Sequence, residues 1–443
     1  YVSEMEEGLK GHKSSLQMIP ARHASMPTGS EQGRYCFLDV GGSTLKIGRV
    51  NLSGNGKYVL TGAMREAEFT DIQKNGVASD LFDYIAENIA DYLEENSIDE
   101  KDVIFGFTWS FPFDQIDVDS GIHRAWAKKW HTKGVIGKDI VKLLRKAIAK
   151  NKRLKSKNII MPVICHDAMA TFVAGRYIEP DCGESVILGT GTNASYMELT
   201  DNIQKLKNKP SVAEICMDQE WGGFDKILLT KWDELLDGTS GNKGRQILEK
   251  TVSGIYLGEI SRLIFKDLIA EKILFDGKSF MAFDEKYHEK NNPLGFQTSY
   301  MSRIIADISE DLRDVNVLLV ELGVADSTIK DRQLLKDMCM LVAKRGARIV
   351  ATVMLATIIK NDPNLEKPHS VAIDGSLFEK FSFFKTCMEE ALVELIGEKV
   401  SRIKMFLVKD GSGIGAAILA AVTHDKPKSF FKKRVFRSSD FAL

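Results

Sequence analysis

Short apolar runs that end at glycines alternate with stretches of helical periodicity along the chain. Residues 35–40 predict a buried strand, residues 41–44 a tight turn and residues 45–50 a returning strand. Apolar spacing then predicts a helix at 82–93, a strand at 103–107 and a second helix at 140–148. This alternation of strands and helices indicates an α/β lobe.

A second glycine-rich hairpin follows in the middle of the chain. A strand at 159–165 leads through Asp167 into a helix at 168–176, and the hairpin then comprises a strand at 185–188, the turn Gly189-Thr190-Gly191-Thr192-Asn193 and a strand at 195–197. It repeats the pattern of the first hairpin about one lobe later. We infer a weak internal duplication.

The last third of the chain has a different pattern. Residues 244–360 are mainly helical in periodicity. A strand at 370–373 then ends at Asp374-Gly375-Ser376, and a strand at 403–408 ends at Asp410-Gly411-Ser412-Gly413. An apolar helix at 414–422 is expected after these glycines.

Length and charge narrow the class of protein. A chain of 443 residues exceeds what one core usually serves, so we expect two lobes. With 60 Lys and Arg against 61 Asp and Glu, nothing favours nucleic acid or a polyanion as the main partner. The six cysteines occur singly, which favours a reducing compartment. No apolar run reaches the length of a membrane span, and the segment after Tyr1 has no signal-peptide core, so we expect a cytoplasmic protein.

The four glycine turns are candidates for binding a polyphosphate, because backbone N–H groups in such turns bind phosphate without an intervening side chain. They occupy 41–44, 189–192, 374–376 and 411–413. Each follows an apolar strand, so we expect them along one edge of a sheet. Any one of them alone is more typical of an ordinary hairpin, but four turns at strand ends beside Asp or Thr favour phosphate binding. A Walker loop is excluded, because Gly277-Lys278-Ser279 has Lys272 where the first glycine belongs.

Transfer of a phosphoryl group to a hydroxyl needs a carboxylate that accepts the proton. Asp167 is the candidate base, and its alternative role is that of a helix N-cap. Glu220 and Glu249 are candidates for accepting hydrogen bonds from the hydroxyls of a pyranose. Taken alone, Glu249 also fits a solvated helix position.

At these residues the chain resembles the eukaryotic hexokinase family. Residues 39–44, Asp-Val-Gly-Gly-Ser-Thr, are similar to the family's first phosphate hairpin, with Ser-Thr for the usual Thr-Asn and Lys46 for the usual arginine. Residues 107–112, Phe-Thr-Trp-Ser-Phe-Pro, resemble its sugar-loop motif, and residues 188–197 resemble its second phosphate hairpin. The resemblance runs nearly end to end. It implies an α/β fold of the two-lobed actin-like ATPase (RNase H-like) type, with a sugar cleft between a small and a large lobe.

The resemblance also implies roles for individual residues. Asp167 and Lys128 are implied as catalytic, and the sugar ligands are implied to be Ser110, His166, Asn193, Glu220 and Glu249. The implied ATP contacts are Asp39, Gly41, Gly42, Ser43, Thr44, Lys46, Gly189, Thr190, Gly191, Asp374, Gly375, Ser376, Gly411, Ser412 and Gly413. The implied domains are an N-terminal segment packed on the large lobe (1–33), the small lobe (34–163), the large lobe (164–410), a helix returning to the small lobe (411–424) and a basic tail (425–443).

Two motifs depart from the family pattern. The usual Asn-Asp-Thr around the base is His166-Asp167-Ala168, so an imidazole replaces an amide in the sugar shell. His166 has two open roles, hydrogen bonding to a hydroxyl or a structural one. Counting without gaps places Trp126-Ala127-Lys128 on the family's Trp-Thr-Lys, which removes the threonine. Thr132-Lys133-Gly134 imitates that motif five residues later, and we expect Lys133 to be an ordinary loop charge.

The predicted activity is that of a hexokinase. The γ-phosphoryl group of Mg-ATP passes to the 6-hydroxyl of glucose or a related hexose, giving hexose 6-phosphate and ADP in the first step of glycolysis. Mg²⁺ is expected to be held through water and ATP oxygens, with no metal ligands from the chain. The expected partners are the hexose and ATP, with no nucleic acid, in a monomer or homodimer. The alternatives are a kinase for fructose, mannose or glucosamine, and a sugar-sensing homologue with weak catalysis.

Overall fold

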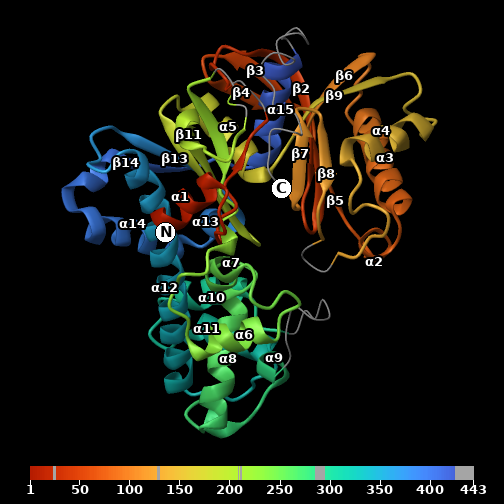
Figure 1. Cartoon of the computed structure of the whole chain (residues 1–443). Helices are drawn as coiled ribbons and strands as arrows, with labels where there is room; N and C mark the ends of the chain where they lie inside the picture. The colour runs from red at the N-terminus through yellow and green to blue at the C-terminus, as the bar shows by residue number, and fades with distance from the viewer. Residues whose placement is uncertain (23–25, 127–129, 208, 210–211, 285–294, 425–443) are drawn as a thin grey trace.

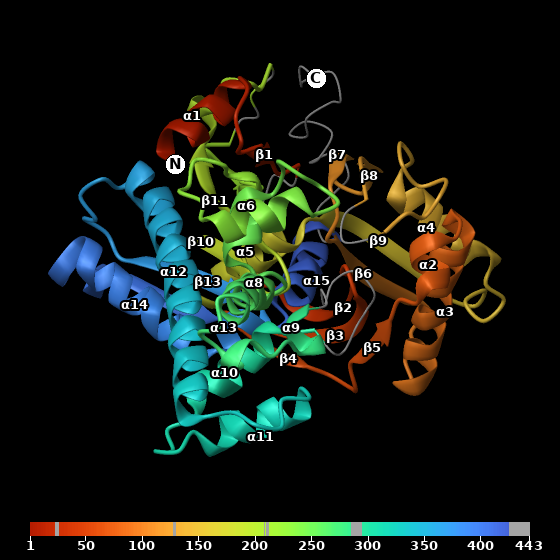
Figure 2. The same ribbon diagram turned by 90° about the horizontal axis from the view of Figure 1, so that it is seen from below.

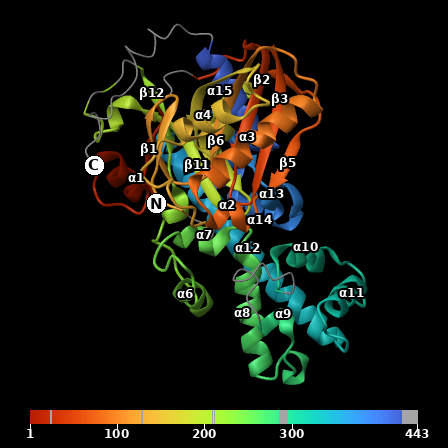
Figure 3. The same cartoon turned by 90° about the vertical axis from the view of Figure 1, so that its right-hand side faces the viewer.

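The computed structural model describes the chain apart from residues 23–25, 127–129, 208, 210–211, 285–294 and 425–443. The predicted basic tail therefore lies outside the described residues. Two β-sheets stand side by side, and a body of helices extends below the second sheet (Figure 1). The helices that project beyond both sheets in Figure 3 include α8 (Leu257–Ala270), α9 (Met281–Asp284), α10 (Thr298–Ala306) and α11 (Arg313–Glu321). No described helix is long and apolar enough to cross a membrane.

The first sheet is built around the first glycine hairpin. β2 (Gln32–Val40) runs antiparallel to β3 (Thr44–Gly54) and parallel to β6 (Asp102–Trp109), which runs parallel to β9 (Asn158–Cys165). β4 (Lys57–Leu60) and β5 (Arg65–Glu68) both pair with β3. The order is β4-β3-β2-β6-β9. All the strands predicted in this half of the chain are confirmed.

The second sheet repeats this order with other strands. β10 (Cys182–Leu188) runs antiparallel to β11 (Thr192–Leu199) and parallel to β13 (His369–Asp374), which runs parallel to β14 (Ile403–Leu407). β12 (Glu214–Asp218) and β1 (Ile19–Pro20) extend the sheet beyond β11, in the order β1-β12-β11-β10-β13-β14. A hairpin followed by two parallel strands occurs in both sheets, in agreement with the inferred duplication.

Side chains of β2 alternate between two cores, as the period of a strand requires. Leu38 packs in one core with α3 (Ala78–Glu95) and α4 (Ile140–Lys150). Phe37 packs on the opposite face in a core with α5 (Asp167–Ile178) and α15 (Gly411–His424). In the view from below, α5 and α15 lie between the two sheets (Figure 2). These two helices therefore connect the halves of the molecule.

α15 approaches its neighbours so closely that two contact positions require glycine. A Cβ added at Gly415 would lie 1.7 Å from the carbonyl oxygen of Ala170, and one at Gly106 would lie 1.8 Å from that of Ala416. Both oxygens belong to helix backbone and cannot rotate away. A side chain at either position would push α15 off α5 or off β6.

The other face of the second sheet is covered by α12 (Ile329–Asn361). This helix starts at a capping box, in which Thr328 and Asp331 exchange hydrogen bonds between side chain and backbone. α1 (Val2–Lys10) packs into the same core, and β1 pairs with β12. The helical region predicted at 244–360 is confirmed.

One expectation about the glycine turns is wrong. The four turns do not line one sheet, because the turn at 41–44 joins strands of the first sheet and the others follow strands of the second. The helix expected in the last turn region is present as α15, which already begins at Gly411, so the glycines at 411–413 form its first turn. Small residues there let the first helical turn pack against Phe37.

Several short elements were not predicted. They comprise β1, β4, β5, α2 (Asp71–Asn75), the hairpin of β7 (Phe113–Asp117) and β8 (Ser120–His123), β12, α6 (Lys231–Gly238), α13 (Ser376–Lys380) and α14 (Ser382–Ile396), whereas α7 (Ile247–Val252) lies inside the predicted helical region. Most of them are too short for a hydrophobic period to be visible. The six cysteines are free and buried.

Candidate active site

One serine brings the first glycine turn together with the ends of β13 and β14. Ser412 donates from its hydroxyl to Asp39 Oδ2 at 2.5 Å and from its backbone nitrogen to Asp374 Oδ2 at 3.2 Å. Beside it, Lys46 Nζ lies 2.7 Å from Asp410 Oδ1. Candidate nucleotide residues from two different sheets therefore form one group.

Burial controls the charge of this group. It raises the pKa of Asp39 to about 6 and the pKa of Asp374 to about 7. Burial opposes the charge of Lys46, but the hydrogen bond and charge of Asp410, together with the charges of Asp39 and Glu66, outweigh burial and raise the pKa of Lys46. Asp39 Oδ1 is buried and has no hydrogen-bond partner among the described residues. Such an oxygen beside glycine turns fits a hydrated Mg²⁺ that arrives with phosphate groups.

The second glycine turn touches the turn after β13. A Cβ at Gly189 would lie 3.7 Å from the Cα of Gly375. Gly375 has φ +126°, and a Cβ there would lie 2.3 Å from the carbonyl oxygen of Leu188, so both conformation and space require glycine. Ser376 begins α13, and Thr190 is exposed. Backbone donors of two turns are thus available side by side.

The candidate sugar residues surround the end of this second hairpin. Asn193 Nδ2 donates to Asp218 Oδ1 at 2.8 Å, and Asn193 Oδ1 accepts from Trp221 N at 3.3 Å. Glu220 lies between Asp218 and Trp221 in the sequence, and its backbone has a left-handed φ of 53°. Glu249, in α7, accepts from Thr192 N at 3.1 Å. The solvated role considered for Glu249 is therefore wrong, because its carboxylate is partly buried against the turn.

His166 adjoins this group and is almost completely buried. Its ring stacks on Phe113 with centroids 4.0 Å apart, and Nδ1 lies 3.5 Å from Asp218 Oδ2. Burial lowers the pKa of His166 to about 3. Burial raises the pKa of Asp218 well above its ordinary value, and the charges of Glu220 and Asp167 add to the increase. Sequence reasoning missed Asp218, although the apolar run before it marks the end of a strand.

Asp167 lies between the two groups. It is the first residue of α5 rather than its N-cap, which is His166, and its Oδ1 accepts from Ala168 N at 2.7 Å. Burial, and to a smaller extent the charge of Asp167, raise the pKa of Asp39 and of Asp218. Because His166 is the N-cap, the N-cap role of Asp167 is wrong, and its charge reaches candidate residues of both groups.

The remaining candidates, Ser110 and Lys128, come from the first half of the chain. Ser110 follows β6, and its backbone nitrogen donates to Val40 O at 3.0 Å, beside the first glycine turn. Lys128 and Ala127 lie outside the described residues. Lys133 is exposed and bonded to the α2 region through its backbone, with Lys133 N donating to Gly76 O at 2.9 Å.

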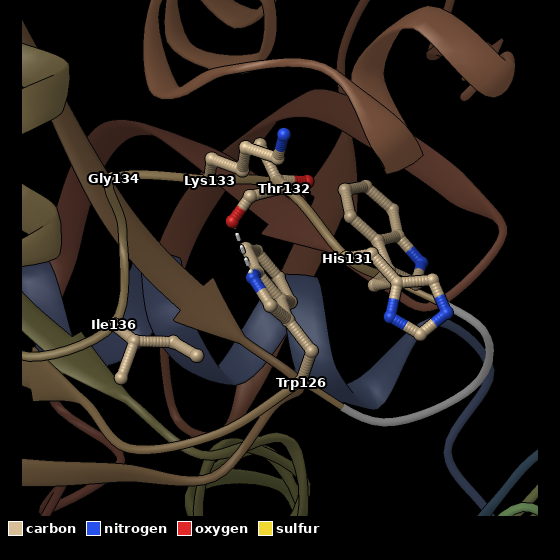
Figure 4. A pocket seen from close by; sticks show the side chains of 7 residues that line it. Trp126, His131, Thr132, Lys133, Gly134 and Ile136 are labelled. Atoms are coloured by element: carbon tan, nitrogen blue, oxygen red, sulfur yellow. Dashed lines mark hydrogen bonds between the residues drawn. The ribbon is translucent and has the colours of Figure 1, made fainter.

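An open pocket of about 420 Å³ is lined by described residues between Trp126 and Ile136. Its lining residues are Trp126, Trp130, His131, Thr132, Lys133, Gly134 and Ile136, most of which are labelled in Figure 4. Trp126 Nε1 donates to Thr132 O at 2.7 Å (Figure 4). The hydroxyl of Thr132 donates to Gln73 O at 2.7 Å. The described lining of the pocket therefore comes from the first half of the chain and includes none of the predicted site residues.

Known proteins match the chain over almost its whole length. Hexokinase family models match residues 1–177 and 184–422. Hexokinase-2 of Oryza sativa subsp. japonica is 35% identical over 433 residues, which are 94% of this chain and 85% of that protein. Hexokinase-1 of Spinacia oleracea is 36% identical over 434 residues, with the same 94% and 85% coverage.

The solved structures agree. A hexokinase from Schistosoma mansoni, complexed with glucose, superposes with a TM-score of 0.83 at 28% identity, over 95% of this chain and 93% of that one. This match confirms the two-lobed actin-like fold. These similarities establish that the chain belongs to the hexokinase family of ATP-dependent sugar phosphotransferases, in agreement with the position of Asp167 near both groups of candidate residues.

Proposed function

We propose that the chain transfers the γ-phosphoryl group of Mg-ATP to the 6-hydroxyl of glucose or a related hexose. The observation that carries the proposal is the position of Asp167. Its charge adds to the burial that raises the pKa of Asp39, among the glycine turns, and the pKa of Asp218, among the polar residues around the second hairpin. A base at that boundary reaches a hydroxyl held on one side while a phosphoryl group is held on the other.

The proposed ATP site uses the turns at 41–44 and 189–191, the turn at 374–376 and the start of α15. Ser412 supports this role because it already joins Asp39 and Asp374. Mg²⁺ bound with ATP would reduce the repulsion between the phosphates and the incoming hydroxyl. Asp39, with its unpartnered buried oxygen, is the residue that would hold the hydrated ion.

The proposed sugar site consists of Ser110, His166, Asn193, Glu220 and Glu249. Asn193 and Glu249 have their orientations set by contacts with Asp218 and with the Thr192 backbone. In the reaction, Asp167 takes the proton of the 6-hydroxyl while the hydroxyl oxygen bonds to the γ-phosphorus. The bond between the γ-phosphorus and the bridging oxygen breaks, and ADP leaves. Lys128 is proposed to stabilise the migrating charge, since the hydroxyl of Thr132 is already bonded to Gln73 and the Thr132-Lys133 segment is held at α2.

The sugar preference is the least constrained part of the proposal. His166 is buried with a strongly lowered pKa, so a neutral imidazole faces the sugar shell where the family has an amide. An imidazole offers one donor and one acceptor, and an amide offers more of each. Fructose, mannose or glucosamine are therefore the alternative acceptors. We also propose a cytoplasmic setting, which six free buried thiols support.

A coupled ADP-release assay across glucose, fructose, mannose and glucosamine tests the proposal. We expect ADP release that depends on one of these sugars and on Mg²⁺. Sugar binding without ADP release would instead identify a sensing homologue.

A further inference from the structure

His166 and Glu220, two of the proposed sugar residues, form a cluster with Asp218. They contribute one ring nitrogen and two carboxylate oxygens, all within 4.8 Å of one another. The residues come from the N-cap of α5 and from the end of β12, so two separate elements are required to assemble the cluster.

Two buried polar atoms in the cluster lack hydrogen-bond partners among the described residues. They are Asp218 Oδ2 and His166 Nε2, in side chains that are 0% and 4% exposed. The other carboxylate oxygen of Asp218 is fully used, because it accepts from Asn193 Nδ2 at 2.8 Å and from Glu220 N at 3.3 Å. These donors fix the carboxylate so that Oδ2 lies 3.5 Å from His166 Nδ1 without a hydrogen bond to it.

A second pair of the same residue types shows what a satisfied contact looks like. His369 Nε2 and Asp362 Oδ2 are 3.0 Å apart and hydrogen bonded, with 17% and 12% of the side chains exposed. The buried pair is longer, has no such bond and has a second carboxylate beside it. Its spacing is close to the edge of a tetrahedral site, about 3.4 Å for ligands about 2.1 Å from the ion.

From this arrangement we propose that His166, Asp218 and Glu220 bind one divalent transition-metal ion, of the class of Zn²⁺ or Co²⁺. An ion bonded to Asp218 Oδ2 and to His166 Nδ1 would satisfy the buried carboxylate oxygen that is otherwise unpartnered, and it would balance two adjacent carboxylates. The nitrogen ligand disfavours Mg²⁺, which prefers oxygen and retains its water. This site is distinct from the hydrated Mg²⁺ expected at Asp39.

The site has a consequence that rests on the proposed function. His166 and Glu220 are candidate sugar ligands, and the same lone pairs cannot bind a metal ion and sugar hydroxyls together. The ion and the sugar should therefore exclude each other.

Equilibrium binding of Co²⁺ to the full chain, without sugar or ATP, tests the metal site. The visible spectrum identifies the ligands, because thiolate coordination by a buried cysteine adds intense sulfur bands that nitrogen and oxygen ligands lack. We expect one Co²⁺ per chain without sulfur bands, and binding weakened at least about tenfold in Glu220→Gln and His166→Gln. His369→Asn is the matched control and should bind like the unmodified protein.

Unchanged binding in both site variants, sulfur bands, or loss only in His369→Asn would overturn the metal site. Circular dichroism of each variant shows that it is folded, and Glu220→Gln keeps the side-chain shape if His166→Gln does not fold. Glucose added to the Co²⁺ complex should release the ion, and retention of the ion under saturating glucose would overturn mutual exclusion. Because Co²⁺ binding is measured without turnover, an absence of ADP release leaves this result interpretable.

Discussion

The hairpins β2–β3 and β10–β11 occupy corresponding places in their sheets, since two parallel strands follow each of them across the sheet. Their surroundings differ. The turn of the first lies beside Asp39, which is bonded to Ser412 of a helix 373 residues away. The turn of the second leads directly into Asn193, whose amide holds Asp218 only 25 residues away.

In the proposed site, this difference lets one repeated unit serve two chemistries. The first hairpin gains its polar partners from the far end of the chain and places them around glycine turns, as phosphate binding requires. The second gains local partners with oriented donors and acceptors, as binding of a polyol requires. Asp167 begins α5, and its charge adds to the burial that raises the pKa of Asp39 and of Asp218.

The largest expected effect on turnover is at Asp167, the proposed base at the start of α5. Asp167→Asn should lower turnover by about 10²–10⁴-fold, because an amide cannot accept the proton of the hydroxyl. Sugar binding, followed by the fluorescence of Trp221, should be retained. The exposed Asp181, just beyond the same helix, provides the control Asp181→Asn. Turnover of Asp167→Asn within a fewfold of the unmodified protein would show that the base lies elsewhere.

Next in size is the cation assigned to the migrating phosphoryl group. Lys128→Ala should lower turnover by about 10²-fold, as for other charges that act in a site without water. Lys133→Ala should leave turnover nearly unchanged, because Lys133 is exposed. Steady-state kinetics of the two variants separate the assignments. The reverse ranking would mean that Thr132-Lys133-Gly134 is the functional motif.

A paired experiment separates the roles of the hairpins directly. Ser412→Ala removes the donor to Asp39 and should raise KM for ATP about tenfold, while Asn193→Ala leaves Asp218 without its amide donor and should raise KM for the sugar by a similar factor. Each variant should leave the other KM within about twofold. Equal effects of either variant on both constants would contradict the division of labour.

The smallest expected effect is on stability. Burial raises the pKa of Asp374 to about 7, whereas an unfolded aspartate titrates near 4. The folded protein thus retains a proton that the unfolded chain loses, so this residue costs stability increasingly as pH rises from about 4 to 7. Asp374→Asn should raise Tm relative to the unmodified protein by an amount that grows over that window to roughly a few °C. A difference in Tm that is independent of pH would contradict this origin.

The sequence predicted those parts of the site that depend on local pattern. An apolar strand followed by glycines places Asp39, Gly189 and Asp374 at strand ends wherever the strands lie. It does not show which sheet a strand joins, and for this reason the four turns were wrongly assigned to one edge. Pairing depends on contacts distant in sequence, such as that between Ser412 and Asp39.

Residues whose role depends on burial were harder to predict. Glu249 resembles a surface helix residue until α7 packs it against Thr192. Asp218 is an ordinary acid in the sequence, and only the approach of His166 from another element reveals that one of its oxygens is unpartnered. The position of Asp167 followed from a strand leading into a helix, which is a local pattern.

The close packing of α15 on the first sheet has a consequence for biosynthesis. The strands β2, β6 and β9 are complete once residue 165 has been made, but part of their apolar face is covered by a helix that ends at His424. At about 5–20 residues per second, the ribosome needs roughly 10–50 s to reach that point. For that interval the nascent first sheet presents Phe37 and its neighbours without their final cover, and a chaperone that binds apolar strands would find its substrate there.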